Sequence, residues 1–161
     1  MERGWGFVFR SSLAAPPEVV WDRITTMQGV NDELAPIFRM THPRGLDRLP
    51  ADAPTGVRLF RSWVLLFGVI PVDYDDLTLV RIEPGRGFLE SSQLLTARWW
   101  EHERTIEPLA GGTLLSDRIA FEPRLRAMGP VLFRVTRALF AHRHRRLRAR
   151  FGGRPVAADS V

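Results

Sequence analysis

A histidine and an arginine on one predicted strand, with an aspartate on the next, form the polar arrangement best suited to chemistry. His102 and Arg104 lie two residues apart, so both side chains point to the same face of an extended strand. Asp117 interrupts the apolar face of the following strand. If a two-residue loop, Ala110–Gly111, joins the strands, Arg104 lies directly opposite Asp117. An odd number of loop residues would abolish this pairing.

Three roles are open to this inward-facing cluster. A guanidinium binds carboxylates, enolates and phenolates, so Arg104 could hold the polar end of a ligand while His102 supplies a proton or a hydrogen bond. Acid/base catalysis by His102, Arg104 and Asp117 is the catalytic alternative. The structural interpretation is that Arg104 and Asp117 pair with each other and fix the strand register, with His102 satisfied nearby. Pairing of this kind is common in protein cores, because a buried charge is costly unless it has a partner.

Two other groups of titratable residues have the wrong spacing for a metal site. Asp73, Asp75 and Asp76 lie on one strand, where adjacent residues point to opposite faces, and no second cluster accompanies them. We expect them to form a solvated strand end. His142 and His144 stand about 200° apart around a helix, so they cannot share a metal ion and are expected at the surface. The sequence therefore predicts no metal and no cofactor.

The distribution of charge argues against nucleic acid as a partner. The net charge is +5, but residues 1–123 contribute −4, from 13 Arg against 17 Asp and Glu, and residues 124–161 contribute +9, from 10 Arg against one Asp. All 23 basic residues are Arg, which indicates a GC-rich coding bias. We expect the basic helix end to be solvated and favoured by the helix dipole. Docking to an anionic membrane or to a protein is the alternative.

Composition and length also indicate a compartment and a domain count. The chain has no cysteine, and its first residues, MERGWGFVFR, lack the apolar core and cleavage site of a signal peptide. No apolar run approaches the ~18 residues of a membrane span, so we expect a cytoplasmic protein with no integral membrane association. A single domain is predicted over residues 1–152, followed by a disordered tail at 153–161. The sequence leaves open whether the protein forms a homodimer.

Most elements that must position the cluster are predicted strands. Residues 6–12 alternate as a short strand, and a helix then begins near Pro17, followed by a second short helical turn at 32–34. The proline-rich residues 41–56 are typical of a long surface loop. Five strands follow, over residues 58–67, 69–83, 88–95, 98–107 and 113–122.

The longest helical pattern covers residues 125–151, with a kink or a restart near Gly129–Pro130. Its apolar stripe runs through Met128, Leu132, Val135 and Leu139. Consecutive strands joined by short turns imply an antiparallel meander, and an amphipathic helix of this length is suited to cover its apolar face. The fold class is therefore α+β.

In this order of elements the chain resembles the SRPBCC superfamily, which includes START domains, Bet v 1 allergens and polyketide cyclases. Three stretches carry the resemblance: SSLAAPPEVVWDRITTMQGVNDELAP, WWEHERTIEPLAGGTLLSDRIAFEP and AHRHRRLRARF. The middle stretch is similar to a pattern of an aromatic residue, His, Gly-Gly-Thr and Asp found in bacterial members. The resemblance implies a helix-grip fold, in which a curved antiparallel sheet of six to seven strands wraps around the C-terminal helix, with two short helices after the first strand.

This resemblance also implies a function, the binding of a small hydrophobic or amphipathic ligand in a cavity between the sheet and the C-terminal helix. One alternative is a polyketide cyclase or aromatase-like enzyme that uses His102 and Arg104. A second is a docking module that uses the basic helix end. The expected ligand-binding residues are Trp63, Trp100, His102, Arg104, Asp117, Phe121, Met128, Leu132, Val135 and Leu139.

Overall fold

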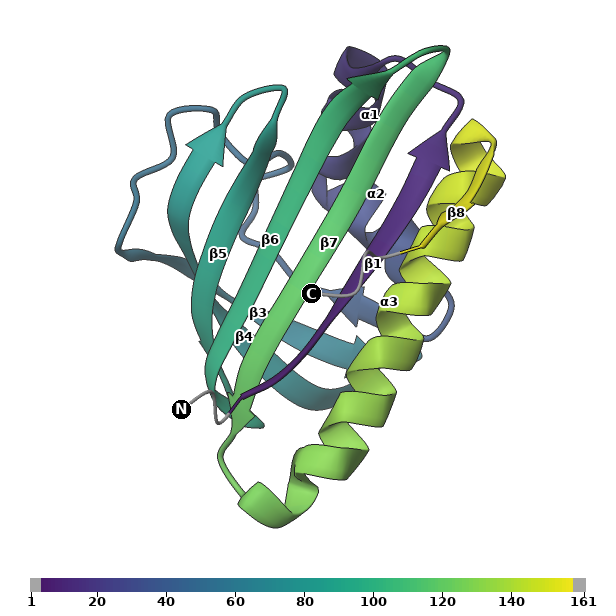
Figure 1. The fold of residues 1–161 in the computed structure, drawn as a ribbon. Helices are drawn as coiled ribbons and strands as arrows, with labels where there is room; N and C mark the ends of the chain where they lie inside the picture. The colour runs from purple at the N-terminus through teal and green to yellow at the C-terminus, as the bar shows by residue number, and fades with distance from the viewer. Residues whose placement is uncertain (1–3, 158–161) are drawn as a thin grey trace.

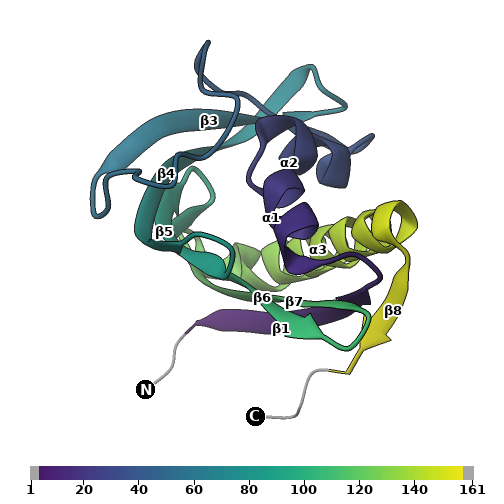
Figure 2. The same cartoon turned by 90° about the horizontal axis from the view of Figure 1, so that it is seen from above.

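The computed structural model describes residues 4–157 and shows a curved antiparallel sheet that holds a long C-terminal helix on its concave side (Figure 1). The long helix is α3 (Gly129–Phe151), and two short helices, α1 (Pro17–Ile24) and α2 (Met27–Leu34), follow the first strand. Figure 2 shows α1 and α2 on the same side of the sheet as α3. The predicted α+β helix-grip fold is confirmed.

Eight strands form the sheet within the described residues, in the order β2-β3-β4-β5-β6-β7-β1-β8. The six predicted strands are present, and two short edge strands raise the number above the expected six to seven. The strands are β1 (Trp5–Leu13), β2 (Phe38–Met40), β3 (Arg58–Leu66), β4 (Ile70–Glu83), β5 (Gly87–Leu94), β6 (Ala97–Leu109), β7 (Gly112–Pro123) and β8 (Gly153–Val156).

Residues 153–156, which were expected to begin a disordered tail, form strand β8. The chain turns back after α3 at Gly152 and Gly153, and β8 then pairs with β1, with Val156 opposite Arg10 and Gly153 opposite Leu13. An added Cβ on Gly153 would lie 1.8 Å from the carbonyl oxygen of Ser12, so only glycine allows this close approach. Residues 158–161 of the expected tail lie outside the described residues.

Helix α3 restarts where the sequence places Gly129–Pro130. A 3₁₀ turn (Arg126–Met128) precedes it, and Pro130 occupies the first turn, where a missing N–H costs no hydrogen bond. Gly129 is required there because an added Cβ would lie 2.6 Å from the indole nitrogen of Trp5. The helix ends at Gly152, whose φ is +74° and whose N–H donates to the carbonyl of Arg148.

Two apolar clusters fill the space between the sheet and the helices. One contains Leu115 and packs around α1 and the end of α3, and the other contains Trp100 and packs around the middle of α3. Strand β6 contributes Ile106 to the first cluster and Trp100 to the second. The inward-facing residues between them, His102 and Arg104, are therefore enclosed by apolar packing at both ends.

Candidate functional site

The hairpin of β6 and β7 has the predicted register. Ala110 and Gly111 form the loop, with Gly111 at a φ of +79°, and Arg104 lies directly opposite Asp117. On the outer face Glu103 lies opposite Arg118, as this register requires. The alternation of the two strands thus brings Arg104, Asp117 and His102 together on the concave face, all of them buried.

Arg104 is fully enclosed and bound by two carboxylates. Its Nε and Nη2 donate to Oδ1 and Oδ2 of Asp117, both at 2.7 Å, while Nη1 and Nη2 donate to Oε1 and Oε2 of Glu33 at 2.9 and 3.0 Å. Glu33, on α2, also accepts a bond of 2.8 Å from Nε of Arg143 on α3. Two guanidinium groups and two carboxylates therefore join the sheet to α2 and α3. The expected pairing of Arg104 with Asp117 is present, and Glu33 and Arg143 extend it.

The arginines hold both carboxylates in their ionised form. Burial alone would raise the pKa of Glu33, but Arg104 and Arg143 outweigh it and lower that pKa. Burial likewise opposes ionisation of Asp117, but Arg104 and then His102 hold its pKa well below the usual range. Two cations thus balance two anions in a dry site, where an unpaired charge would cost several kcal/mol.

The ionised Asp117 also determines how the histidines are protonated. Nε2 of His102 lies 2.8 Å from Oδ1 of Asp117, and Nε2 of His144 lies 3.0 Å from Oδ2. An ionised carboxylate can only accept hydrogen bonds, so both histidines carry a hydrogen on Nε2. The Nδ1 atom of His144 then faces the hydroxyl of Ser11 at 2.8 Å, and Ser11 accepts in turn from Arg148 at 2.7 Å.

The prediction that His142 and His144 lie at the surface is wrong for His144, which is buried, while His142 is half-buried and lies 2.8 Å from the carbonyl of Ala35. Arg143 is buried too, so the basic helix end is only partly solvated. The reason is that α2 and β1 pack against this part of α3 and enclose one of its faces. Arg145 remains exposed, together with Arg146 and Arg150.

The acidic stretch of β4 is also more buried than the sequence predicted. Asp76 faces outward and accepts two hydrogen bonds from Arg61, at 2.7 and 2.9 Å. Asp75 faces inward and is buried, and Asp73 is half-buried and accepts bonds from Thr96. Of the three acids expected to be solvated, only Asp76 faces outward. Asp73 and Asp75 share the opposite face of the strand, where Asp73 is half-buried and Asp75 is buried.

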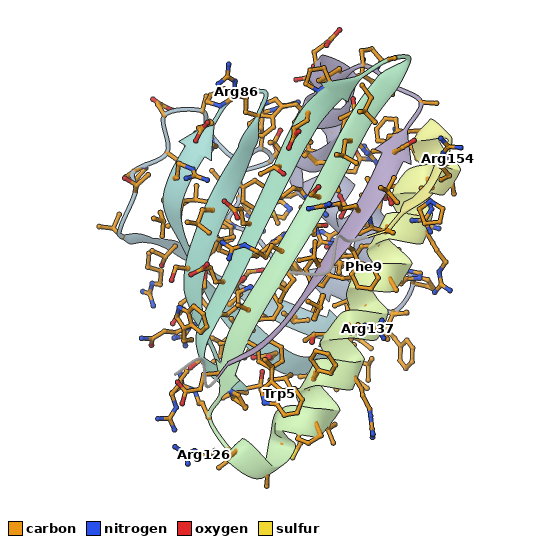
Figure 3. The ribbon with its side chains drawn as sticks, viewed as in Figure 1. Trp5, Phe9, Arg86, Arg126, Arg137 and Arg154 are labelled. Atoms are coloured by element: carbon orange, nitrogen blue, oxygen red, sulfur yellow. The ribbon has the colours of Figure 1, made fainter. Side chains whose placement is uncertain are left out.

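A cavity of about 410 Å³ lies beside the buried charged cluster, between the sheet, α2 and α3. Most of its lining is apolar, including Leu34, Phe60, Leu79 and Phe88. Val72 on β4 and Val135 on α3 belong to the lining and are 39% and 47% exposed, which shows where the cavity meets solvent. Figure 3 shows Trp5 and Phe9 of β1 beside α3, where Trp5 packs on Phe133 with ring centroids 5.2 Å apart.

Six of the ten expected ligand-binding residues line this cavity and four do not. Phe121 packs behind Trp100, with their ring centroids 5.9 Å apart, and Asp117 is enclosed by its partners. Trp63 lies on the outer face of β3 and Met128 lies in the exposed 3₁₀ turn, so both are outside the lining. The residues that line the cavity are Trp100, His102, Arg104, Leu132, Val135 and Leu139.

Sequence reasoning missed the acids that contribute to this site. Glu33 is the partner of Arg104, and Asp75 and Glu90 line the cavity. The alternation of β4 could have indicated that Asp75 faces inward, because Asp75 shares a face with Asp73 and not with Asp76. Glu33 carried none, because nothing in an eight-residue helix indicates an arginine 71 positions later.

Between residues 4 and 157, no three His, Cys, Asp or Glu side chains are grouped so that they could hold a metal ion. In the same range, no helix has both the length and the apolar character needed to cross a membrane.

Comparison with known proteins identifies the family. Residues 11–151 match the model of a domain of unknown function, DUF8410, so the chain belongs to this family. No curated protein sequence matches it. Among solved structures, protein CV1439 from Chromobacterium violaceum has a TM-score of 0.70 at 19% identity, over 92% of this chain and 98% of that one.

Two further solved structures connect this fold to the superfamily that the sequence resembles. A START superfamily protein from Mycobacterium smegmatis has a TM-score of 0.65 at 14% identity, over 91% of this chain and 97% of that one. Ara h 8.0201 has a TM-score of 0.56 at 10% identity, over 91% and 99%. At these identities the likeness is one of fold, and it confirms the expected START/Bet v 1-like fold.

Proposed function

We propose that this DUF8410 domain binds a small hydrophobic or amphipathic ligand in the cavity between the sheet, α2 and α3. The cavity itself supports this proposal: it measures about 410 Å³, within the range of roughly 300–1,000 Å³ typical of ligand pockets, and its walls are mainly apolar. Two of its lining residues, Val72 and Val135, are also exposed, so a ligand has a way in.

The charged cluster supports the cavity as part of its wall. Apolar side chains tend to close over an empty space, because a void forfeits their packing contacts. Here Arg104 ties β6 to β7 and α2, and Glu33 ties α2 to α3, through hydrogen bonds of 2.7–3.0 Å. We infer that these fixed distances keep α2 and α3 from collapsing onto the sheet.

This role makes Arg104 a poor anchor for an anionic ligand. Four of its hydrogen bonds are committed to Asp117 and Glu33, and both acids are ionised. A ligand carboxylate could engage Arg104 only by displacing one of them into a dry site. The assignment of His102 and Arg104 to polyketide-like chemistry stays a prediction from the resemblance, with less geometric support than binding.

Filling the cavity tests the proposal. Leu139→Trp places a large side chain into the lining, while Ala138→Trp, one residue earlier, adds the same side chain to the exposed face of α3. We expect 1-decanol to bind the wild type and Ala138→Trp in titration calorimetry, and to bind Leu139→Trp at least tenfold more weakly. Equal affinities for both variants would rule out this cavity as the binding site.

A chain-length series gives a second measure of the same site. Burying one methylene contributes about 0.8 kcal/mol, so each two-carbon extension of the alcohol should tighten binding roughly tenfold until the cavity is full. Affinity that does not depend on tail length would contradict burial of the tail in the cavity.

A further inference from the structure

One carboxyl oxygen in the cavity wall has no hydrogen-bond donor among the described residues. Asp75 of β4 is 7% exposed and lines the cavity, and its Oδ1 atom is buried with no hydrogen-bond partner in the described part of the chain. A buried acceptor left unpaired costs about 1–3 kcal/mol, so it needs a partner that the protein itself does not supply. Because this atom belongs to the wall of the proposed binding cavity, the missing partner points to a ligand.

The neighbouring polar groups are already engaged. Glu90 of β5, 6% exposed, also lines the cavity and accepts the hydroxyl hydrogen of Ser92 at 2.7 Å, so Ser92 has none left for Asp75. Nδ1 of His102 lies 3.8 Å from Oε2 of Glu90. Asp73 accepts hydrogen bonds from Thr96. Oδ1 of Asp75 is therefore the carboxyl oxygen of this group that has no donor in the described part of the chain.

The acids in this part of the wall outnumber the cations available to them. Asp73, Asp75 and Glu90 line the cavity, and the arginines of the lining, Arg104 and Arg143, are bound to Asp117 and Glu33. Among residues 4–157, His102 alone faces Glu90 as a potential cation. In an apolar enclosure this imbalance favours a positively charged ligand and opposes an anionic one.

The protonation of the pair agrees with this imbalance. Burial, and then the adjacent Glu90, raise the pKa of Asp75 well above its usual value. Burial opposes ionisation of Glu90 as well, but the neighbouring His102 and Asp75 outweigh it and lower its pKa. The two carboxyls therefore disfavour carrying two negative charges side by side, and a cation bound between them relieves this repulsion.

We propose that the ligand of this cavity carries a protonated amine, which binds to Asp75 and Glu90 while its apolar body fills the remaining space. The proposal rests on the proposed binding function of the same cavity. An ammonium group has three donors, enough to reach the free oxygen of Asp75 and the carboxylate of Glu90. Its positive charge beside the two carboxyls stabilises their ionised forms.

A matched set of ligands separates this proposal from its alternatives. Decylamine, 1-decanol and decanoate have the same tail and differ in the head group. The protein has a net charge of +5, so attraction to its surface favours decanoate over decylamine. A preference for the amine must therefore come from the cavity.

Titration calorimetry at pH 7, below the micelle concentrations, should rank decylamine first, at least tenfold tighter than 1-decanol, with decanoate weakest. Asp75→Asn and Glu90→Gln should each weaken decylamine roughly tenfold and leave 1-decanol within about twofold. Asp76→Asn, on the outer face of the same strand, should change neither ligand. Circular dichroism would show that each variant is folded. If one of the two variants does not fold, the other still tests the amine site.

The outcomes are distinct. If 1-decanol binds and decylamine is no tighter, or if decanoate is the tightest of the three, the amine site is wrong while the binding function stands. If decylamine is preferred but neither Asp75→Asn nor Glu90→Gln reduces the preference, the site is elsewhere. If none of the three ligands binds, the binding function fails and this inference fails with it.

Discussion

Removing the charge of Glu33 tests the buried cluster most severely. Glu33 accepts hydrogen bonds from Arg104 at 2.9 and 3.0 Å and from Arg143 at 2.8 Å. The substitution Glu33→Gln keeps the size of the side chain and one acceptor oxygen. It leaves two buried guanidinium groups with Asp117 as their only carboxylate within this cluster.

The size of the effect follows from burial. Breaking a buried ion pair by removing one partner costs about 3–5 kcal/mol, since the other charge stays in a dry site. For a chain of this length, 1 kcal/mol corresponds to about 2–4 °C in the melting temperature. Glu33→Gln should therefore lower the melting temperature by roughly 6–20 °C.

Thermal denaturation followed by circular dichroism measures this loss, and Glu103→Gln is the matched control. Glu103 also accepts from two arginines, Arg81 at 2.9 Å and Arg118 at 3.0 Å, but Arg118 is 56% exposed and solvent screens the pair. Exposed pairs contribute at most about 1 kcal/mol. If Glu33→Gln melts no lower than Glu103→Gln, the cluster does not hold the helices to the sheet.

Two pH dependences follow from the shifted pKa values. The pKa of Glu33 and that of Asp117 are lowered by folding, so their stabilisation is present above the unfolded values near pH 4 and is lost as the pH falls through the folded values. Urea unfolding should show a steep loss of stability below about pH 4 in the wild type and a shallower one in Glu33→Gln, and parallel curves would contradict this. The pKa of Asp75 is raised by folding, so this carboxyl does not destabilise the fold at low pH. The free-energy cost of its buried charge grows as the pH rises above about 4. Asp75→Asn should therefore match the wild type near pH 3 and exceed it in unfolding free energy at pH 7, and a loss at pH 7 would show that the carboxyl stabilises the empty protein.

The sequence predicted the parts of the site that depend on local period. Alternation along β6 and β7 placed His102, Arg104 and Asp117 on one face, and the Ala110–Gly111 loop set their register. The restart of α3 at Gly129–Pro130 was also visible, because both residues act on the backbone within one turn. These features involve residues near one another in the chain or joined by a tight turn.

The rest depended on contacts between distant elements. Glu33 meets Arg104 only after α2 folds onto the sheet, and the burial of His144 depends on where α2 and β1 pack on α3. A crowd of arginines near a helix end looks solvated whichever face is later covered. Strand β8 was missed because it is short and forms only as an edge partner of β1.

The central claim, that a ligand enters the cavity, can be tested by labelling the five tryptophans with fluorine and recording ¹⁹F NMR spectra during a titration with decylamine. Trp100 lines the cavity, whereas Trp21 packs at the other apolar cluster, and Trp100→Phe and Trp21→Phe assign the two signals. A saturable shift of the Trp100 signal, with Trp21 unchanged, is the predicted result. A Trp100 signal that stays in place while ligand binds, or one that shifts no more than Trp21, would contradict binding in the cavity.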